Sequence, residues 1–319
     1  MTDYLAPPNR FDFYRNIKNI CATHNSYVYV SHINGTQRGE KIVLKFIPKG
    51  GHISNEQIDN ECKIQSSIHH PFIMPARYIF DIDYERQPYR VIEMPLAIGS
   101  LADTHAEKLL YGIIHASKIM YQIALAVMYL HINHILHGDI NPRNVVLMVD
   151  NKDNPVAQII DFGHACELKH QTLVDDNTGH TYDGYFCTCN RLTPRYSSPE
   201  VLGRKPHSFP SDIWSLGATF YFIITGKCVY HENNYDFMIK EAKYPYLNYN
   251  TKLGPEFPQI GKDLITKMLS FEESNRPTAQ ECLDSPFFNS ILDPKWMEEQ
   301  NNLISQMDKS SEINDALNL

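Results

Sequence analysis

The chain has 319 residues, about twice the length of a typical domain, so two lobes or domains are expected. Its composition is 43% hydrophobic, 11% aromatic and 21% charged, which disfavours disordered, collagen-like and coiled-coil chains. The formal net charge is −8 and no basic block is present. We therefore expect no nucleic-acid partner.

The first ten residues lack the cationic flank and apolar core of a signal peptide. The sequence has no run of about 18 apolar residues, so we expect no membrane span. Its most apolar stretch, 119–132, is interrupted by Gln122 and His131. The seven cysteines are odd in number and mostly scattered, which is typical of a reduced protein rather than a disulfide framework. We expect a cytoplasmic or otherwise intracellular protein with no membrane partner.

The first ninety-odd residues have the pattern of β-strands separated by turns. Strands are expected over 27–30, 41–46, 74–82 and 89–93. A turn signal lies at 34–39. Ser54 is a candidate N-cap for a helix that carries Ile58 and Cys62 on its apolar stripe and that ends before His70-Pro71.

Beyond Pro95 the sequence becomes helical. Residues 118–132 carry apolar side chains too densely for a surface helix, which predicts a buried helix in a larger lobe. A strand-rich small half and a helix-rich large half, joined by a hinge near residue 95, predict an α+β protein with a ligand cleft between two lobes. The polar tail 289–319 has apolar residues at loose helical spacing, so both docking on the large lobe and fraying stay open.

The densest group of polar residues lies between positions 139 and 161. Asp139, Asn144 and Asp161 each adjoin an apolar, strand-like run. Carboxylate and amide oxygens at strand ends suit Mg²⁺, which binds phosphates with the help of one or two carboxylates. This group therefore predicts a site for a magnesium–phosphate ligand.

The same residues resemble the motifs of the eukaryotic protein kinase family. His137, Asp139 and Asn144 fit its H-x-D-x-x-x-x-N catalytic loop, and residues 161–163 read D-F-G. The resemblance extends in order from about residue 11 to 288. It implies a two-lobed kinase fold, with a small β-rich lobe over 11–95 that has one main helix, and a larger, mostly helical lobe over 96–288.

Further motifs on both sides support the resemblance. The segment Ile42-Val-Leu-Lys45 is similar to the family's lysine strand, and Glu61 lies where the family's helix glutamate pairs with that lysine. Residues 193–200 resemble the end of an activation segment. Three further positions match residues with structural roles in the family: Glu200, Asp212 and Arg276.

The resemblance implies that ATP and Mg²⁺ are the cofactors and that the substrate is a protein. Asp139 would accept the proton of the substrate hydroxyl, and Asn144 and Asp161 would hold Mg²⁺. Lys45, fixed by Glu61, would orient the triphosphate. The other nucleotide-binding positions carried over from the family are Val28, Val43, Glu93 and Val146.

Three departures from the family pattern concern the nucleotide site. Residues 20–28, where a glycine-rich loop is expected, contain no glycine. Asn141 replaces a lysine that neutralises the transferring phosphate, and losing such a charge-assisted bond costs about 1.5–3 kcal/mol, roughly ten- to more than a hundred-fold in rate. Pro95 stands where a hinge N–H normally meets adenine, and Val43 narrows the adenine pocket.

The activation segment also departs from the pattern. Gly138 replaces the arginine that often grips a phosphorylated segment, so little dependence on such phosphorylation is expected. Arg143 favours acidic residues near the phosphoacceptor. The segment itself, 161–200, is long. It contains the possible zinc ligands His164, Cys166, His170, His180, Cys187 and Cys189. Their spacing favours a mobile polar insert over a zinc site.

These observations favour a serine/threonine protein kinase of reduced activity. Thr193 is typical of the serine/threonine class. The alternative is a pseudokinase that binds partners with weak or no phosphotransfer. A small-molecule kinase is a further alternative, against which Glu200, Asp212 and Arg276 argue. The sequence leaves the substrate and the oligomeric state open.

Overall fold

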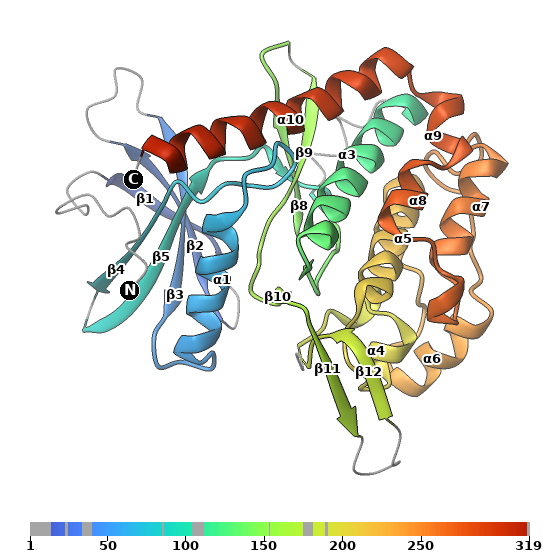
Figure 1. Cartoon of the computed structure of the whole chain (residues 1–319), viewed down its shortest axis with the longest axis horizontal. Coiled ribbons are helices and arrows are strands. Elements are labelled where there is room, and N and C mark those ends of the chain that lie inside the picture. The colour runs from blue at the N-terminus through green and yellow to red at the C-terminus, as the bar shows by residue number, and fades with distance from the viewer. Residues whose placement is uncertain are drawn as a thin grey trace. The chain divides into compact units, whose positions relative to one another are not determined.

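The computed structural model describes residues 14–22, 25–33, 40–84, 86–103, 112–152, 154–174, 181–188 and 191–317. Two compact units make up the chain, Met1–His69 with Met74–Ala97 and His70–Ile73 with Ile98–Leu319. Each unit is described by itself, with its elements labelled in Figure 1. The expected turn at 34–39 lies outside the described residues.

The first unit contains a five-stranded antiparallel sheet with strand order β1-β2-β3-β5-β4. Its strands are β1 (Tyr14–Ala22), β2 (Tyr27–Ile33), β3 (Lys41–Pro48), β4 (Tyr78–Tyr84) and β5 (Gln87–Pro95). Alternate positions of β3, namely Ile42, Leu44 and Phe46, join one buried cluster with Phe80 and Val91. The positions between them, Val43, Lys45 and Ile47, are buried as well, so both faces of β3 are covered.

The strands expected around 27–30, 41–46 and 89–93 are confirmed, and each is longer than expected. The strand expected over 74–82 begins only at Tyr78. Ile73 forms a bridge with Ile159 in the second unit, and Met74 is buried without belonging to a strand. The apolar residues at the start of 74–82 therefore indicated burial, and only the later part of this run forms a strand.

Helix α1 (Asn55–Ser67) belongs to the first unit and begins as expected. The Ser54 hydroxyl accepts from the Gln57 N–H at 3.2 Å, and the Gln57 side chain accepts from the Ser54 N–H at 3.2 Å. This capping box satisfies two backbone donors that would otherwise have no partner in the helix. The apolar stripe of α1, with Ile58 and Cys62, is buried.

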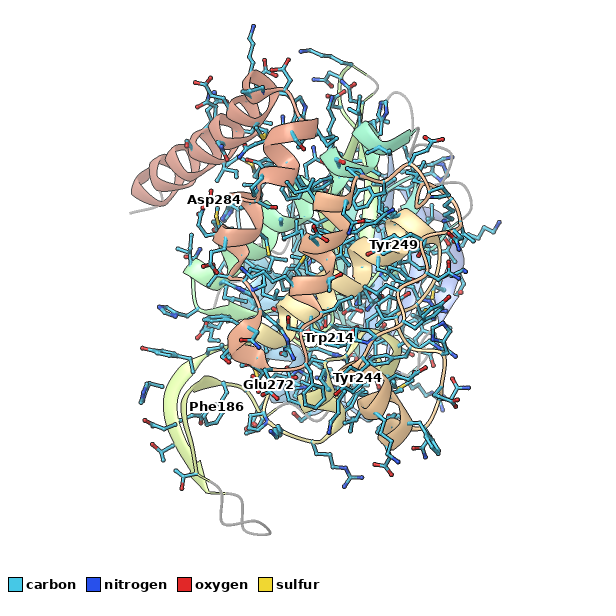
Figure 2. All side chains as sticks on the ribbon, turned by 90° about the vertical axis from the view of Figure 1, so that its right-hand side faces the viewer. Phe186, Trp214, Tyr244, Tyr249, Glu272 and Asp284 are labelled. Atoms are coloured by element: carbon cyan, nitrogen blue, oxygen red, sulfur yellow. A yellow bond between two sulfur atoms is a disulfide. The ribbon has the colours of Figure 1, made fainter. Side chains whose placement is uncertain are left out.

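The second unit is mostly helical. Its helices are α3 (Gly112–Ile132), α4 (Pro199–Leu202), α5 (Phe209–Thr225), α6 (Tyr235–Lys243), α7 (Gln259–Met268), α8 (Ala279–Leu283), α9 (Pro286–Ile291) and α10 (Pro294–Leu317), with short 3₁₀ helices at Pro194–Tyr196 and Glu273–Asn275. Trp214 of α5 lies in the interior, whereas Tyr244, after α6, lies at the surface (Figure 2). The mixed helix and strand content confirms the α+β class.

Short antiparallel sheets complete the second unit. Strands β6 (Gly99–Ser100), β8 (Val145–Val149) and β9 (Pro155–Ile159) form one sheet, in that order. Strand β7 (Ile135–Leu136) pairs with β10 (Cys166–Glu167), and β11 (Lys169–Val174) pairs with β12 (Thr181–Phe186). Because β7, β8 and β9 each end or begin next to a polar loop, they fix where those loops lie.

Helix α3 confirms the expected buried helix and begins earlier, at Gly112. In the described part of the chain it is the one helix long and apolar enough, by length and composition, to cross a membrane. Its most apolar window is 67% buried inside the protein. Burial of this kind is typical of a core helix.

The polar tail forms α10, and the first part of this helix docks on α3. The Trp296 ring lies 6.0 Å from the Tyr121 ring, and Lys118 Nζ lies 5.0 Å from the Trp296 ring centre. Gln122 Nε2 donates to Gln300 Oε1 at 3.2 Å. Of the two outcomes left open for the tail, docking holds for this part of the helix.

Candidate active site

In the first unit, the structure brings Lys45 and Glu61 together. Lys45 lies on β3, and its Nζ donates to Glu61 Oε1 of α1 at 2.5 Å. The two side chains are 11% and 3% exposed. A charged pair with so little water around it depends on close contact, because each ion has lost most of its hydration. The sequence-based pairing of these two residues thus has a direct structural counterpart.

The positions expected to bind the nucleotide base lie on the same sheet. Val28 of β2 pairs with Lys45, and Val43 of β3 pairs with Met94. Glu93 is 2% exposed, and its carboxylate accepts from the Tyr14 hydroxyl at 2.5 Å. Residues 23 and 24 of the expected phosphate loop lie outside the described residues.

The backbone of Glu93 already has a partner. Its carbonyl oxygen accepts from the Arg77 N–H at 2.8 Å, where the chain enters β4. An adenine amine would therefore share this acceptor. Since Pro95, at the end of β5, has no N–H to offer, the edge expected to bind the base is poor in hydrogen-bonding groups.

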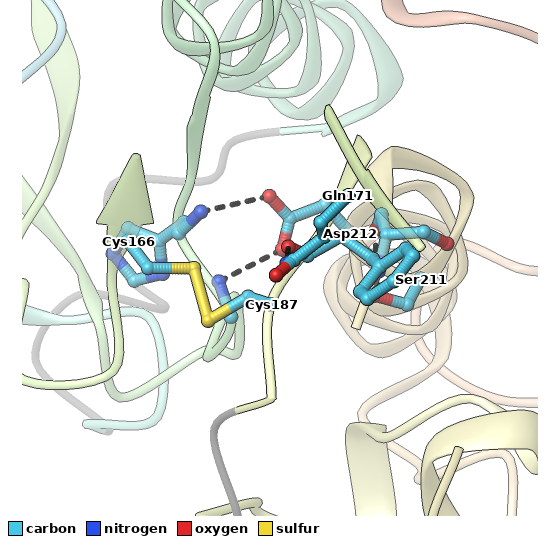
Figure 3. The surroundings of a disulfide bond; sticks show 9 residues. Cys166, Gln171, Cys187, Ser211 and Asp212 are labelled. Atoms are coloured by element: carbon cyan, nitrogen blue, oxygen red, sulfur yellow. Dashed lines mark hydrogen bonds between the residues drawn. A yellow bond between two sulfur atoms is a disulfide. The ribbon is translucent and has the colours of Figure 1, made fainter. Parts of the chain in front are cut away.

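In the second unit, the catalytic loop is anchored on Asp212 of α5. Asp212 Oδ2 accepts from the His137 N–H and Oδ1 accepts from the Gly138 N–H, both at 2.9 Å (Figure 3). Burial raises the pKa of Asp212, but the hydrogen bonds from His131 and the His137 N–H, together with electrostatic interaction with these two residues, outweigh burial and hold it below its usual value. Asp212 thus has the structural role that the resemblance implied.

Gly138 is held in a backbone conformation that side chains rarely adopt. Its φ is +74°, and a Cβ added there would lie 2.8 Å from the carbonyl oxygen of His164. Both the left-handed backbone and the close approach favour glycine. A side chain at position 138, such as the family's arginine, would therefore require the backbone at His164 to shift.

Asp139, the expected proton acceptor, is fixed by two asparagines. Asn144 Nδ2 donates to Asp139 Oδ2 at 2.7 Å and to its carbonyl oxygen at 2.9 Å. Burial raises the pKa of Asp139 to about 7, with the charge of Asp161 acting in the same direction and hydrogen bonds from Thr193 and Asn144 opposing it. A carboxyl that titrates near neutral pH suits a general base.

Asn141 does more than mark a missing lysine. Its Nδ2 donates to the Asp139 carbonyl oxygen at 3.0 Å, and its Oδ1 accepts from the Arg143 N–H at 2.9 Å. The side chain is buried, whereas Arg143 is exposed. Asn141 therefore shapes the loop that presents Asp139, a role that residue identity alone did not reveal.

Asp161 follows β9 and lies beside the catalytic loop. The Ile160 N–H donates to the Asn144 carbonyl oxygen at 2.9 Å, which joins the two loops. Asp161 has a φ of +68°, and its Oδ1 accepts from the Gly163 N–H at 3.2 Å. Strand β8, which begins directly after Asn144, also carries Val146, which is 7% exposed.

The donor set of Asn144 and Asp161 fits Mg²⁺. Among the described residues no group of three or more histidine, cysteine or acidic side chains could hold a metal. Mg²⁺ needs no such cage, because phosphates and water complete its coordination. Since Asn144 uses its amide nitrogen toward Asp139, its amide oxygen remains as a hard donor, and its backbone carbonyl accepts from Ile160, the residue before Asp161.

The activation segment contains a disulfide and a hairpin, neither of which was predicted from the sequence. Cys166 and Cys187 form a disulfide (Figure 3), so neither can be a zinc-binding thiolate, and the expectation of reduced cysteines is wrong for this pair. His180 and Cys189 lie outside the described residues. Within the polar insert, β11 and β12 form an antiparallel hairpin.

The two cysteines are brought together by neighbouring strands. Cys166 pairs with Leu136 of β7. The backbone N–H of Cys187 donates to the His207 carbonyl oxygen at 2.8 Å, and the reverse bond is also 2.8 Å. Sequence separation gave no signal for this pairing, because the contacts that produce it are long-range.

One residue near Asp139 escaped the sequence-based reasoning. His164 Nδ1 lies 3.9 Å from Asp139 Oδ2. Burial lowers the pKa of His164 to about 4, so the ring is neutral at pH 7. Its position directly after D-F-G could have indicated that His164 lies near Asp139. From the sequence, His164 was considered only as a possible zinc ligand.

The expected Glu200–Arg276 pair is present in the second unit. Arg276 Nη1 donates to Glu200 Oε1 at 2.6 Å and Nη2 donates to Oε2 at 2.8 Å. The Arg276 side chain is 0% exposed and lies 5.1 Å from the Trp214 ring centre. This bidentate bond joins the end of the activation segment to a helical core.

Known proteins resemble this chain over most of its length. The protein kinase domain family matches residues 24–288. Human serine/threonine-protein kinase H1 is 26% identical over 82% of this chain. Calcium-dependent protein kinase 3 of Plasmodium berghei is 31% identical over 79% of the chain, and serine/threonine-protein kinase PLK4 of Nematostella vectensis is 29% identical over 81%.

These alignments cover 58%, 42% and 24% of the lengths of the three relatives. The family match covers far more than half of the chain, from the second strand of the first unit to the α9 helix of the second. It includes Lys45, Glu61, Asp139, Asn144 and Asp161. The chain belongs to the eukaryotic protein kinase family.

Proposed function

We propose that this protein transfers the γ-phosphate of ATP to serine or threonine hydroxyls of protein substrates, at a reduced rate. The observation that carries the proposal is the state of Asp139. Its carboxylate is held by Asn144 at 2.7 Å and has a pKa raised to about 7 by burial. A fixed carboxylate that takes up a proton near neutral pH is suited to accept the hydroxyl proton of a substrate.

The remaining residues divide the work of positioning. The Lys45 ammonium, fixed by Glu61, would orient the triphosphate, and Asn144 with Asp161 would hold the metal. Mg²⁺ bound with ATP would supply neutralisation of charge on the transferring phosphoryl group. Asn141 and Asp212 keep the loop in the shape that presents Asp139.

A pseudokinase is the second candidate, and specific features favour it. The phosphate loop lacks glycine, Pro95 offers no N–H, and the Glu93 carbonyl already accepts from the Arg77 N–H. These features weaken the grip on the nucleotide and leave the transfer residues in place. They support a reduced rate more directly than a complete loss.

The test is transfer of labelled γ-phosphate to a generic protein in the presence of Mg²⁺. Asp161→Ala removes one metal oxygen and should lower the signal by about a hundredfold or more. Asp263→Ala, an exposed aspartate on α7, is the matched control and should retain the wild-type rate. Equal signals from wild type and Asp161→Ala would contradict transfer. A nucleotide-induced rise in melting temperature would then identify a binding scaffold.

A further inference from the structure

A buried arginine in the first unit links the sheet to α1. Arg90 of β5 is 8% exposed. Its Nε donates to Asp81 Oδ1 of β4, and its Nη2 donates to Asp81 Oδ2 at 3.3 Å. Its Nη1 donates to Asp59 Oδ1 of α1 at 3.1 Å. One planar guanidinium therefore contacts a strand and a helix at the same time.

The contact with α1 occurs at two positions. Arg90 also forms a side-chain hydrogen bond with Cys62, whose pKa burial raises to about 12. Asp59 and Cys62 are three residues apart, so they lie on the same face of the helix. Glu61 lies between them in sequence. Fixing both neighbours fixes the rotation of α1 at the turn that carries Glu61.

The contact with the sheet lies close to Lys45. Arg90 pairs with Ile47 of β3, and Lys45 pairs with Ile92, so the two side chains lie two register positions apart on adjacent strands. The strand that carries the lysine and the helix that carries the glutamate are therefore tied by the same guanidinium. The Lys45–Glu61 distance of 2.5 Å depends on both elements.

We propose that Arg90 is a positioning residue for the phosphate-binding pair, holding α1 so that Glu61 stays within reach of Lys45. This inference rests on the proposed function, because the Lys45–Glu61 pair matters for transfer only if the protein binds ATP. Arg90 acts through Glu61 and is not itself placed against the nucleotide. Its partners Asp81 and Asp59 are 51% and 60% exposed, which leaves the tether adjustable.

The test compares variants at both ends of the tether. Arg90→Met removes the hydrogen bonds to Asp81, Asp59 and Cys62, and Asp59→Asn weakens the contact with α1. Arg86→Gln is the matched control, because Arg86 is an exposed arginine of the same unit, at the turn between β4 and β5. The readouts are kcat and KM for ATP, together with amide hydrogen exchange over residues 55–67.

We expect Arg90→Met to raise KM for ATP about tenfold and Asp59→Asn about threefold, each with a smaller change in kcat. Arg90→Lys keeps the positive charge but loses the planar guanidinium that binds two partners at once. Its KM for ATP should lie between those of wild type and Arg90→Met. Exchange over 55–67 should accelerate in the same order. Arg86→Gln should match wild type in every readout.

Combination with Glu61→Gln separates positioning from a general structural role. If Arg90 acts through Glu61, Arg90→Met adds no further loss of ATP affinity in the Glu61→Gln background. Additive losses overturn the proposal. If Arg90→Met fails to fold, Asp59→Asn takes its place in the same comparison.

Failure of the proposed function gives a different pattern. In that case wild type and Asp161→Ala transfer equally, whatever happens at Arg90. The exchange measurement still decides the tether, since unchanged exchange over 55–67 in both Arg90→Met and Asp59→Asn overturns it. Faster exchange confined to that segment supports it.

Discussion

The two units each contain a buried arginine, and the two arginines differ in how far their carboxylate partners are exposed. Arg276 in the second unit donates to both oxygens of Glu200 and also to the carbonyl oxygens of Ser270, Phe271 and Pro210. Its side chain is 0% exposed and that of Glu200 is 4% exposed. Arg90 in the first unit is nearly as buried, but its aspartate partners are more than half exposed.

The two arginines differ because their carboxylate partners lose different amounts of hydration on folding. A fully buried ion pair has given up its hydration on both sides, so removing one partner leaves an uncompensated charge in the interior. A pair with an exposed carboxylate keeps water on one side, and its contribution is modest. We therefore assign Arg276 to holding the fold together and Arg90 to placing one helix.

The largest expected effect is on Arg276. Arg276→Ala should lower the free energy of unfolding by about 3–5 kcal/mol, because the Glu200 carboxylate stays buried without its partner. Denaturant unfolding followed by circular dichroism measures this change. Lys205→Ala, an exposed cation in the same unit, is the control and should stay within about 0.5 kcal/mol of wild type. A loss below about 1 kcal/mol for Arg276→Ala would break the comparison.

A buried group with no charged partner gives the next largest effect, and it depends on pH. His70 is 2% exposed, its Nδ1 accepts from the Phe72 N–H at 3.2 Å, and its ring lies 4.7 Å from the Tyr129 ring. Burial lowers the pKa of His70 from 6.5 to about 3. Below pH 6.5 the unfolded chain therefore takes up this proton before the folded chain does.

Stability from His70 is fully present above pH 6.5 and is lost as the pH falls toward 3. From pH 6.5 to 5 the loss should reach about 2 kcal/mol, at about 1.4 kcal/mol per pH unit. His70→Gln should remove that part of the slope in denaturant unfolding at several pH values, whereas the exposed His231→Gln should keep it. Parallel slopes for wild type and His70→Gln would refute the assignment.

The smallest expected effect is on the exposed end of the Arg90 tether. Asp59→Asn should change the free energy of unfolding by less than about 1 kcal/mol, and the change should shrink further at about 1 M salt. The Arg276→Ala loss should persist at that salt concentration, because water and ions do not reach the pair. Salt curves for the two variants, measured side by side, sharpen the contrast. Equal salt dependence of the two stability losses would contradict the proposed difference between Arg90 and Arg276.

The sequence could predict what depends on neighbours along the chain or on a family motif. The Ser54 cap and the buried stripe of α1 are local patterns, and the structure has both. The pairs Lys45–Glu61 and Glu200–Arg276 came from the resemblance. Their roles in binding and transfer stay predictions.

The features that escaped prediction depend on contacts between distant segments. Arg90 lies 31 residues from Asp59, and Cys166 lies 21 residues from Cys187, with no local pattern linking either pair. The β11–β12 hairpin is polar in sequence, and only a mobile polar insert was predicted there. From the sequence, Asn141 was interpreted only as the replacement of a lysine. Its two hydrogen bonds within the catalytic loop depend on the folded backbone.

The glycine at 138 limits how this kinase could come under new control. A side chain there would meet the His164 carbonyl oxygen at 2.8 Å and would need a left-handed backbone. Acquiring an arginine that reads a phosphate on the activation segment would therefore require the D-F-G-His backbone to shift first. The glycine therefore couples any side chain at position 138 to the backbone that follows D-F-G.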